Sequence, residues 1–102
     1  MARFNVYQYG SKNVPYLLDV QANLLNDLNT RVVIPLVPQN KAGQEVLPKL
    51  KPIIQIKGKS HILMTTDIGT LTKSSIGKFI TNIEDTHRDD VTEALDFLFQ
   101  GF

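Results

Sequence analysis

Residues 30–37 read Thr-Arg-Val-Val-Ile-Pro-Leu-Val, a run dominated by apolar and β-branched side chains. Such a run is typical of a β-strand in the centre of a small domain. It contains Pro35, which cannot donate a hydrogen bond to a sheet ladder. The sequence therefore predicts a strand over 30–37 that has a bulge or an edge position at Pro35.

The segments before this run also indicate antiparallel strands. Residues 3–9 are rich in aromatic and β-branched side chains, and the turn-forming residues 10–13 follow them. Residues 16–21 are predicted to form the antiparallel neighbour of this strand. Residues 22–29 contain four Asn or Asp side chains, which compete for backbone hydrogen bonds and favour turns. We expect a loop there that holds Leu24 and Leu25 near the surface.

The segments after the run contain the best hairpin candidate. Residues 53–56 and 61–64 are two short apolar runs that flank the glycine-containing connection 57–60. The polar, proline-bounded stretch 38–51 predicts a loop, and the role of Lys41–Lys51 within it is left open. Residues 64–69 predict a turn, whereas 71–80 fit either a short strand or a short helix.

The C-terminal segment predicts an amphipathic helix. Asp85 or Thr86 can cap its first turn, and the acidic residues at 89 and 90 suit the positive end of the helix dipole. One apolar stripe follows at helical spacing, formed by Val91, Ala94, Leu95 and Leu98. Gly101 should end the helix.

Several β segments followed by one helix predict an α+β fold, mainly β, in which a strongly bent antiparallel sheet is covered by the terminal helix. No repeat or Gly/Ser linker interrupts the 102 residues, so we expect a single domain over 1–102.

The composition excludes several classes of protein. Cysteine is absent, which excludes disulfide scaffolds, cysteine nucleophiles, redox pairs and thiolate zinc sites. There are only two histidines, so we do not expect a His-rich metal site. We expect neither a metal nor a cofactor. No apolar run approaches the ~20 residues that cross a bilayer, and no signal-like start is present, so we expect a cytoplasmic protein without membrane contact.

Charge is unevenly distributed along the chain. Residues 41–83 contain seven lysines and two acids, whereas six acids and one arginine follow from Glu84 onward. The net charge of +1 is too small for a free-standing nucleic-acid binder. Aromatic residues are not interleaved with the lysines, so we interpret these lysines as a solvated surface.

Candidate catalytic residues are few. His61 and His87 are the side chains that titrate near neutral pH, and Arg31, Asp19 and Asp67 could form a small acid–base site with His61. Their spacing adds no support, so we predict no catalytic residue. Apolar residues in polar settings, at 24–25 and 99–102, favour a protein interface instead.

Five runs stand out together: 19–21 (Asp-Val-Gln), 31–36 (Arg-Val-Val-Ile-Pro-Leu), 64–67 (Met-Thr-Thr-Asp), 76–77 (Ile-Gly) and 99–102 (Phe-Gln-Gly-Phe). With the Phe-Asn-Val-Tyr start at 4–7, their order and spacing resemble the CcdB family of gyrase-poisoning toxins from type II toxin–antitoxin operons. The resemblance extends along the whole chain.

This resemblance implies an SH3-like barrel sheet with a small extra sheet and a C-terminal helix, the CcdB/Kid/MazF-like toxin fold, in a two-fold homodimer. It implies a non-enzymatic toxin that binds the A subunit of DNA gyrase and traps the gyrase complex with cleaved DNA. A CcdA-like antitoxin would neutralise the toxin. The toxin–antitoxin complex would repress its own operon, with operator DNA contacted through the antitoxin.

The family's gyrase-contacting positions correspond here to Leu24, Leu25, Asp96, Phe99, Gln100, Gly101 and Phe102. Three of them differ from the best-known members, which have Trp in place of Gln100, Ile in place of Phe102 and Asn in place of Asp96. Two alternatives remain open. One is a messenger-RNA endoribonuclease of the MazF/Kid type, and the other is a degenerate toxin that binds antitoxin but not gyrase.

Overall fold

The strand β3 (Thr30–Pro38) is the element to which most of the sheet is attached. We describe residues 1–41 and 47–101 from a computed structural model of the chain. The other strands are β1 (Asn5–Gln8), β2 (Tyr16–Asp19), β4 (Ile53–Ile56), β5 (Lys59–Leu63), β6 (Gly69–Thr72) and β7 (Phe79–Asn82). The single described α-helix is α1 (Glu84–Gln100), and four 3-10 turns are η1 (Asn23–Leu25), η2 (Gln39–Lys41), η3 (Thr65–Asp67) and η4 (Lys73–Ser75).

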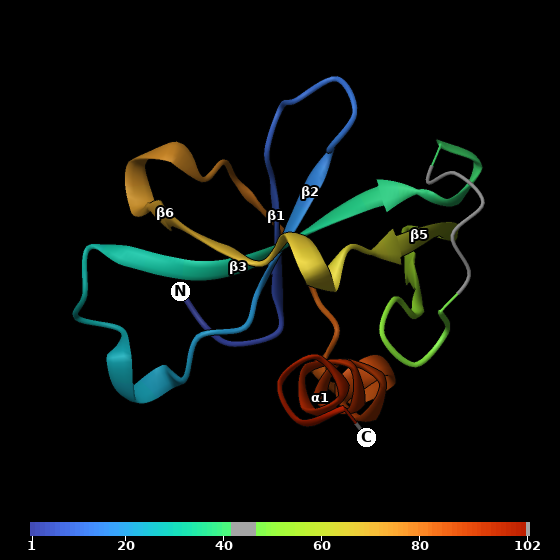
Figure 1. The fold of residues 1–102 in the computed structure, drawn as a ribbon. Coiled ribbons are helices and arrows are strands. Elements are labelled where there is room, and N and C mark those ends of the chain that lie inside the picture. The colour runs from blue at the N-terminus through green and yellow to red at the C-terminus, as the bar shows by residue number, and fades with distance from the viewer. Residues whose placement is uncertain (42–46, 102) are drawn as a thin grey trace.

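The seven strands form one antiparallel sheet in the order β4-β5-β3-β2-β1-β7, with β6 also paired to β3. On one edge the central part of β3, from Val33 to Leu36, pairs with β2. On its other edge the first half pairs with β6 and the last three residues pair with β5. The sheet therefore divides beyond β3 and curls into a half-barrel, with α1 on one side of it (Figure 1).

Pro35 occupies the point where the second edge of β3 changes partner. The β6 pairing ends at Val33 and the β5 pairing begins at Leu36. The Pro35 carbonyl accepts the Met64 N–H at 2.9 Å on this side, so the missing N–H also faces the gap between the two partner strands. The predicted edge position at Pro35 is therefore confirmed locally, although β3 as a whole lies inside the sheet.

Side chains of the central strands alternate between two apolar layers. Val6, Leu18, Ile34 and Leu36 point into the main core, which also takes in Val91 of α1. Their sequence neighbours are also buried, but they lie on the opposite face of the sheet: Tyr7, Leu17 and Val33. Burial on both faces explains why these strands read as continuous apolar runs.

The predicted hairpin is confirmed, with a shorter connection than expected. Lys57 and Gly58 form a two-residue turn in which both φ angles are positive, 52° and 76°. This is the geometry of the type I′ turn that best matches the twist of paired strands. Lys59 and Ser60 consequently belong to β5 and not to the connection. For residues 71–80 the sequence predicted either a short strand or a short helix. The strand prediction is confirmed at both ends of this segment, which belong to β6 and β7.

The helix begins earlier than predicted. Ile83 is the N-cap, and the side chain of Asn82 accepts the Glu84 N–H at 2.9 Å. Asp85 and Thr86 therefore lie inside the first turn, and their predicted capping role is wrong. Of the predicted stripe, Val91 and Ala94 are fully buried, and Leu95 and Leu98 are half-buried. Among the described residues, no helix is long and apolar enough to cross a membrane.

The predicted fold class is confirmed: a curled antiparallel sheet accompanied by one C-terminal helix (Figure 1). The expected small extra sheet takes the form of the β4–β5 hairpin, which continues the main sheet through three residues of β3. The hairpin turn and the β1–β2 connection border the same hollow, through Lys57 on the first and Ser11 and Lys12 on the second.

Gly77 permits the close approach of the chain before β7 to β1. Its N–H donates to the Gln8 carbonyl at 2.8 Å, and an added Cβ would overlap that oxygen and lie 3.1 Å from the carbonyl carbon. Gly77→Ala should therefore lower the free energy of unfolding by about 1–3 kcal/mol in urea titrations. Gly69→Ala is the control, because its Cβ would meet only Asp67 at 3.9 Å, and its effect should stay within about 0.5 kcal/mol. Equal effects of the two variants would contradict this account of β7 packing.

Candidate functional site

The turn between β2 and β3 exposes three leucines. Leu24 on η1 is 92% exposed, and Leu25 and Leu28 are each about half exposed. The prediction that Leu24 and Leu25 lie near the surface is confirmed. Leu28 was not predicted as an exposed residue, although it lies in the same Asn-rich loop. A cluster of exposed leucines on one short turn is typical of a surface that binds another protein.

A buried polar network holds this turn in place. Arg31 donates to both carboxylate oxygens of Asp19 at 2.8 Å, and its remaining Nη1 donates to Asn26 Oδ1 at 2.7 Å. The Gln21 amide donates to the Leu25 carbonyl at 2.9 Å and accepts the Val32 N–H at 3.0 Å. Both ends of the turn are therefore tied to β3, and the leucines project from a rigid support.

The Asp19–Arg31 pair is buried completely, since neither side chain is exposed to solvent. Burial raises the pKa of the Asp19 carboxyl above its usual value, while the Gln21 N–H and the Arg31 guanidinium act to lower it. Desolvation of two charges offsets much of their attraction, so such a pair contributes little net stability while strongly restricting geometry. We interpret it as the device that orients the turn.

The second exposed apolar feature is the C-terminal end of α1. Phe99 is 72% exposed in the last turn, where Asp96 and Gln100 are exposed as well. Gly101 has φ +80° and donates its N–H to the Phe97 carbonyl at 2.9 Å, which ends the helix as predicted. Phe102, the last predicted contact residue, lies outside the described residues.

The two features are separate in one chain. In Figure 1 the η1 turn and α1 both lie below the sheet, with η1 toward the left and α1 near the centre. A single chain therefore presents Leu24–Leu25 and Phe99 as two apolar patches supported by different elements.

The structure does not assemble the acid–base site considered for His61. Asp19 and Arg31 are engaged with each other near the start of β3. His61 pairs with Pro38, seven residues farther along β3, a separation of about 23 Å at the rise of an extended strand. His87 links the helix to the sheet, because its Nε2 accepts the Gln55 N–H at 3.3 Å and its Nδ1 contacts Asp90 at 3.0 Å.

The network around the turn can be tested with two asparagines. Asn26→Ala leaves a buried Arg31 N–H without its acceptor, so the free energy of unfolding should fall by about 1–3 kcal/mol in urea titrations. Asn29→Ala is the control in the same turn, because that side chain is exposed. Limited proteolysis should cut the turn faster in the first variant only. Equal stability of both variants would show that the network does not hold the turn.

Comparisons with known proteins agree with this architecture. The sequence profile described as CcdB protein matches residues 3–101. Among solved structures, the fold is similar to an endoribonuclease in complex with its cognate antitoxin from a mycobacterial species. The TM-score is 0.78 and the sequence identity 17%, over 97% of this chain and 94% of that one. At this identity the structural similarity concerns the fold alone. Because the profile covers nearly the whole sequence, the chain belongs to the CcdB family.

Proposed function

We propose that this CcdB-family toxin binds the A subunit of DNA gyrase and traps the enzyme on cleaved DNA. The contact residues proposed are Leu24, Leu25, Asp96, Phe99, Gln100, Gly101 and Phe102. The toxin acts by binding and not by catalysis. Its site of action is the cytoplasm, where gyrase meets DNA.

One observation carries the proposal: large apolar side chains are exposed on rigid supports at positions that correspond to the family's gyrase contacts. Leu24 is 92% exposed on the anchored turn, and Phe99 is 72% exposed near a capped helix end. Leaving such side chains in water forgoes about 1.5–3 kcal/mol each relative to burial. Rigid apolar residues also lose little conformational entropy when a partner covers them.

A two-fold homodimer would present each patch twice. A symmetric pair of helix ends suits a target that is itself two-fold, because both halves can then be contacted at once. Two linked contacts also bind more tightly than either one alone. We therefore place the homodimer in the proposal as the form that acts on gyrase.

The antitoxin is the second proposed partner. The structurally similar endoribonuclease was solved in complex with its cognate antitoxin, which supports a protein partner of this kind for the present fold. We propose that a CcdA-like antitoxin removes the toxin from gyrase. The complex of both would then repress their operon, with the antitoxin contacting operator DNA.

Gln100 and Asp96 set the strength of the proposed contact. Both are exposed in the last turns of α1. Trp is enriched among residues that dominate binding energy, so Gln at position 100 should weaken the contact relative to a Trp-containing relative. Replacing Gln100 with Trp should therefore strengthen gyrase poisoning.

A gyrase cleavage assay tests the proposal directly. Purified protein is added to gyrase, supercoiled DNA and ATP, and linear DNA is measured after denaturation and protease treatment. The wild-type chain should produce linear DNA. Leu24→Asp and Phe99→Asp should each raise the concentration required by at least about tenfold, and Gln100→Trp should lower it.

Ile53→Asp is the matched control, because Ile53 is a 45% exposed apolar residue on the edge strand β4 and is not one of the proposed contact residues. It should poison gyrase like the wild type, and all four variants should keep the wild-type thermal transition. Absence of linear DNA with folded wild-type protein would overturn gyrase poisoning. Retained antitoxin binding would then identify a degenerate toxin, whereas cleavage of messenger RNA would identify an endoribonuclease.

A further inference from the structure

A groove opens at the end of the half-barrel opposite the buried ion pair. Its larger part has a volume of about 830 Å³ and lies between the end of β3, η2 and the β4–β5 hairpin. A smaller hollow of about 340 Å³ lies between the β1–β2 connection and the start of β7. Pro15, Tyr16 and Lys57 line both hollows, so the two are adjacent, and we refer to them together as the groove.

The groove gathers positive charge. Five of the eight lysines in the chain line it, and all five are exposed: Lys12, Lys41, Lys57, Lys59 and Lys78. Among the described residues, no aspartate or glutamate lines either hollow. This clustering of positive charge at one place contrasts with the net charge of the whole chain, which is only +1. A concave surface lined by one sign of charge focuses its field and attracts ligands of the opposite sign.

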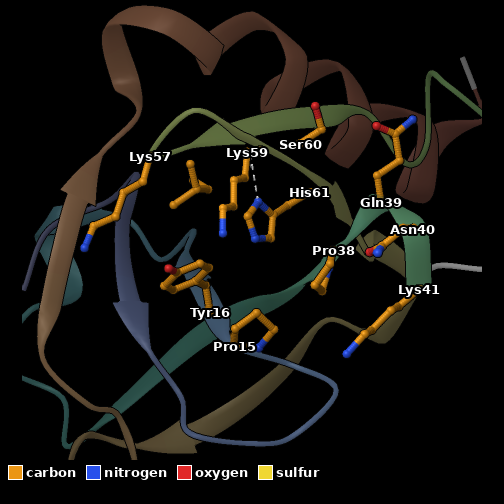
Figure 2. Close-up of a pocket in the computed structure, with 11 residues that line it drawn as sticks. Pro15, Tyr16, Pro38, Gln39, Asn40, Lys41, Lys57, Lys59, Ser60 and His61 are labelled. Carbon is orange, nitrogen blue, oxygen red and sulfur yellow. Dashed lines mark hydrogen bonds between the residues drawn. The ribbon is translucent and has the colours of Figure 1, made fainter.

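The groove also contains an aromatic floor. The half-buried Tyr16 ring meets the His61 ring at 5.3 Å in an edge-on arrangement. His61 Nδ1 lies 3.0 Å from the Lys59 carbonyl, which can only accept, so Nδ1 carries the proton and the ring is held in position. Figure 2 shows the Lys59 amino group beside these rings, with Lys57 on one side of the groove and Lys41 on the other.

We propose that this groove binds single-stranded nucleic acid. Its lysines would contact successive phosphates, and Tyr16 would provide a surface for base stacking. Positively charged grooves with aromatic platforms bind single strands in this way, with little sequence preference. The proposed site shares no residue with the gyrase surface, so this inference stands independently of gyrase poisoning.

The same charge could attract an acidic peptide, but one observation favours nucleic acid. The rings of Tyr16, Pro15 and Pro38 form flat apolar faces beside the charges. Bases can stack on such flat faces, whereas the short acidic side chains of a peptide cannot.

Fluorescence anisotropy with labelled 12-residue oligouridylate RNA tests the proposal, and oligothymidylate DNA of the same length separates RNA from DNA. The wild type should bind at least one of them saturably in 50 mM salt. Lys59→Gln should weaken binding severalfold and reduce the slope of log affinity against log salt by about 0.7. Lys57→Asn should do the same without loss of stability, because Asn suits the positive φ of this turn position.

Two matched comparisons separate the groove from diffuse charge. Lys49→Gln removes an exposed lysine that does not line the groove and should leave affinity unchanged. Tyr16→Phe keeps the ring and should keep binding, whereas Tyr16→Leu should weaken it about tenfold. Equal losses in Lys49→Gln and Lys59→Gln would overturn the site. Failure to bind either oligonucleotide would also overturn it, as would tighter binding of a labelled 12-residue polyglutamate peptide, which would indicate an acidic-peptide site.

Discussion

The pairing of β3 with three other strands is the constraint on which the rest of the structure depends. One edge of β3 is occupied by β2, and the other is divided between β6 and β5. A strand that changes partner along one edge forces the sheet to split and curl, which creates a core on the inner side and an open end. Pro35 sits at the change of partner, where its lack of an N–H is harmless.

The two ends of β3 serve different purposes. At its start, Arg31 forms a buried ion pair with Asp19 and donates a hydrogen bond to Asn26. These bonds fix the turn that carries the exposed leucines. At its finish, Pro38 pairs with His61 and contributes to the lysine-lined groove. A strand of nine residues thus separates an apolar, rigid surface suited to protein contact from a cationic groove suited to a polyanion. Because these surfaces share no residue, each can be altered without disturbing the other.

Rigidity connects the fold to the proposed activity. The turn is fixed by hydrogen bonds that involve a desolvated ion pair, and the end of α1 is fixed by the left-handed Gly101. Neither device adds much net stability, but both limit the number of positions that the exposed apolar side chains can take. A toxin that traps a transient state of its target gains from this order, because less entropy is lost when the complex forms.

The sequence by itself determined the β segments, the curled mainly-β class, the terminal helix with its glycine end, and the family signature. These features are local: alternation, apolar runs and turn residues act within a few positions of one another. Only the tertiary structure decided which strands flank Pro35 and that the Asn82 side chain accepts the Glu84 N–H at the start of the helix. It also decided that Asp19 and Arg31 face each other and not His61. It also placed Tyr16 beside lysines that are distant in sequence. Lys12, Lys57 and Lys78 come from three connections that meet only when the sheet curls, so no pattern along the chain could reveal their groove.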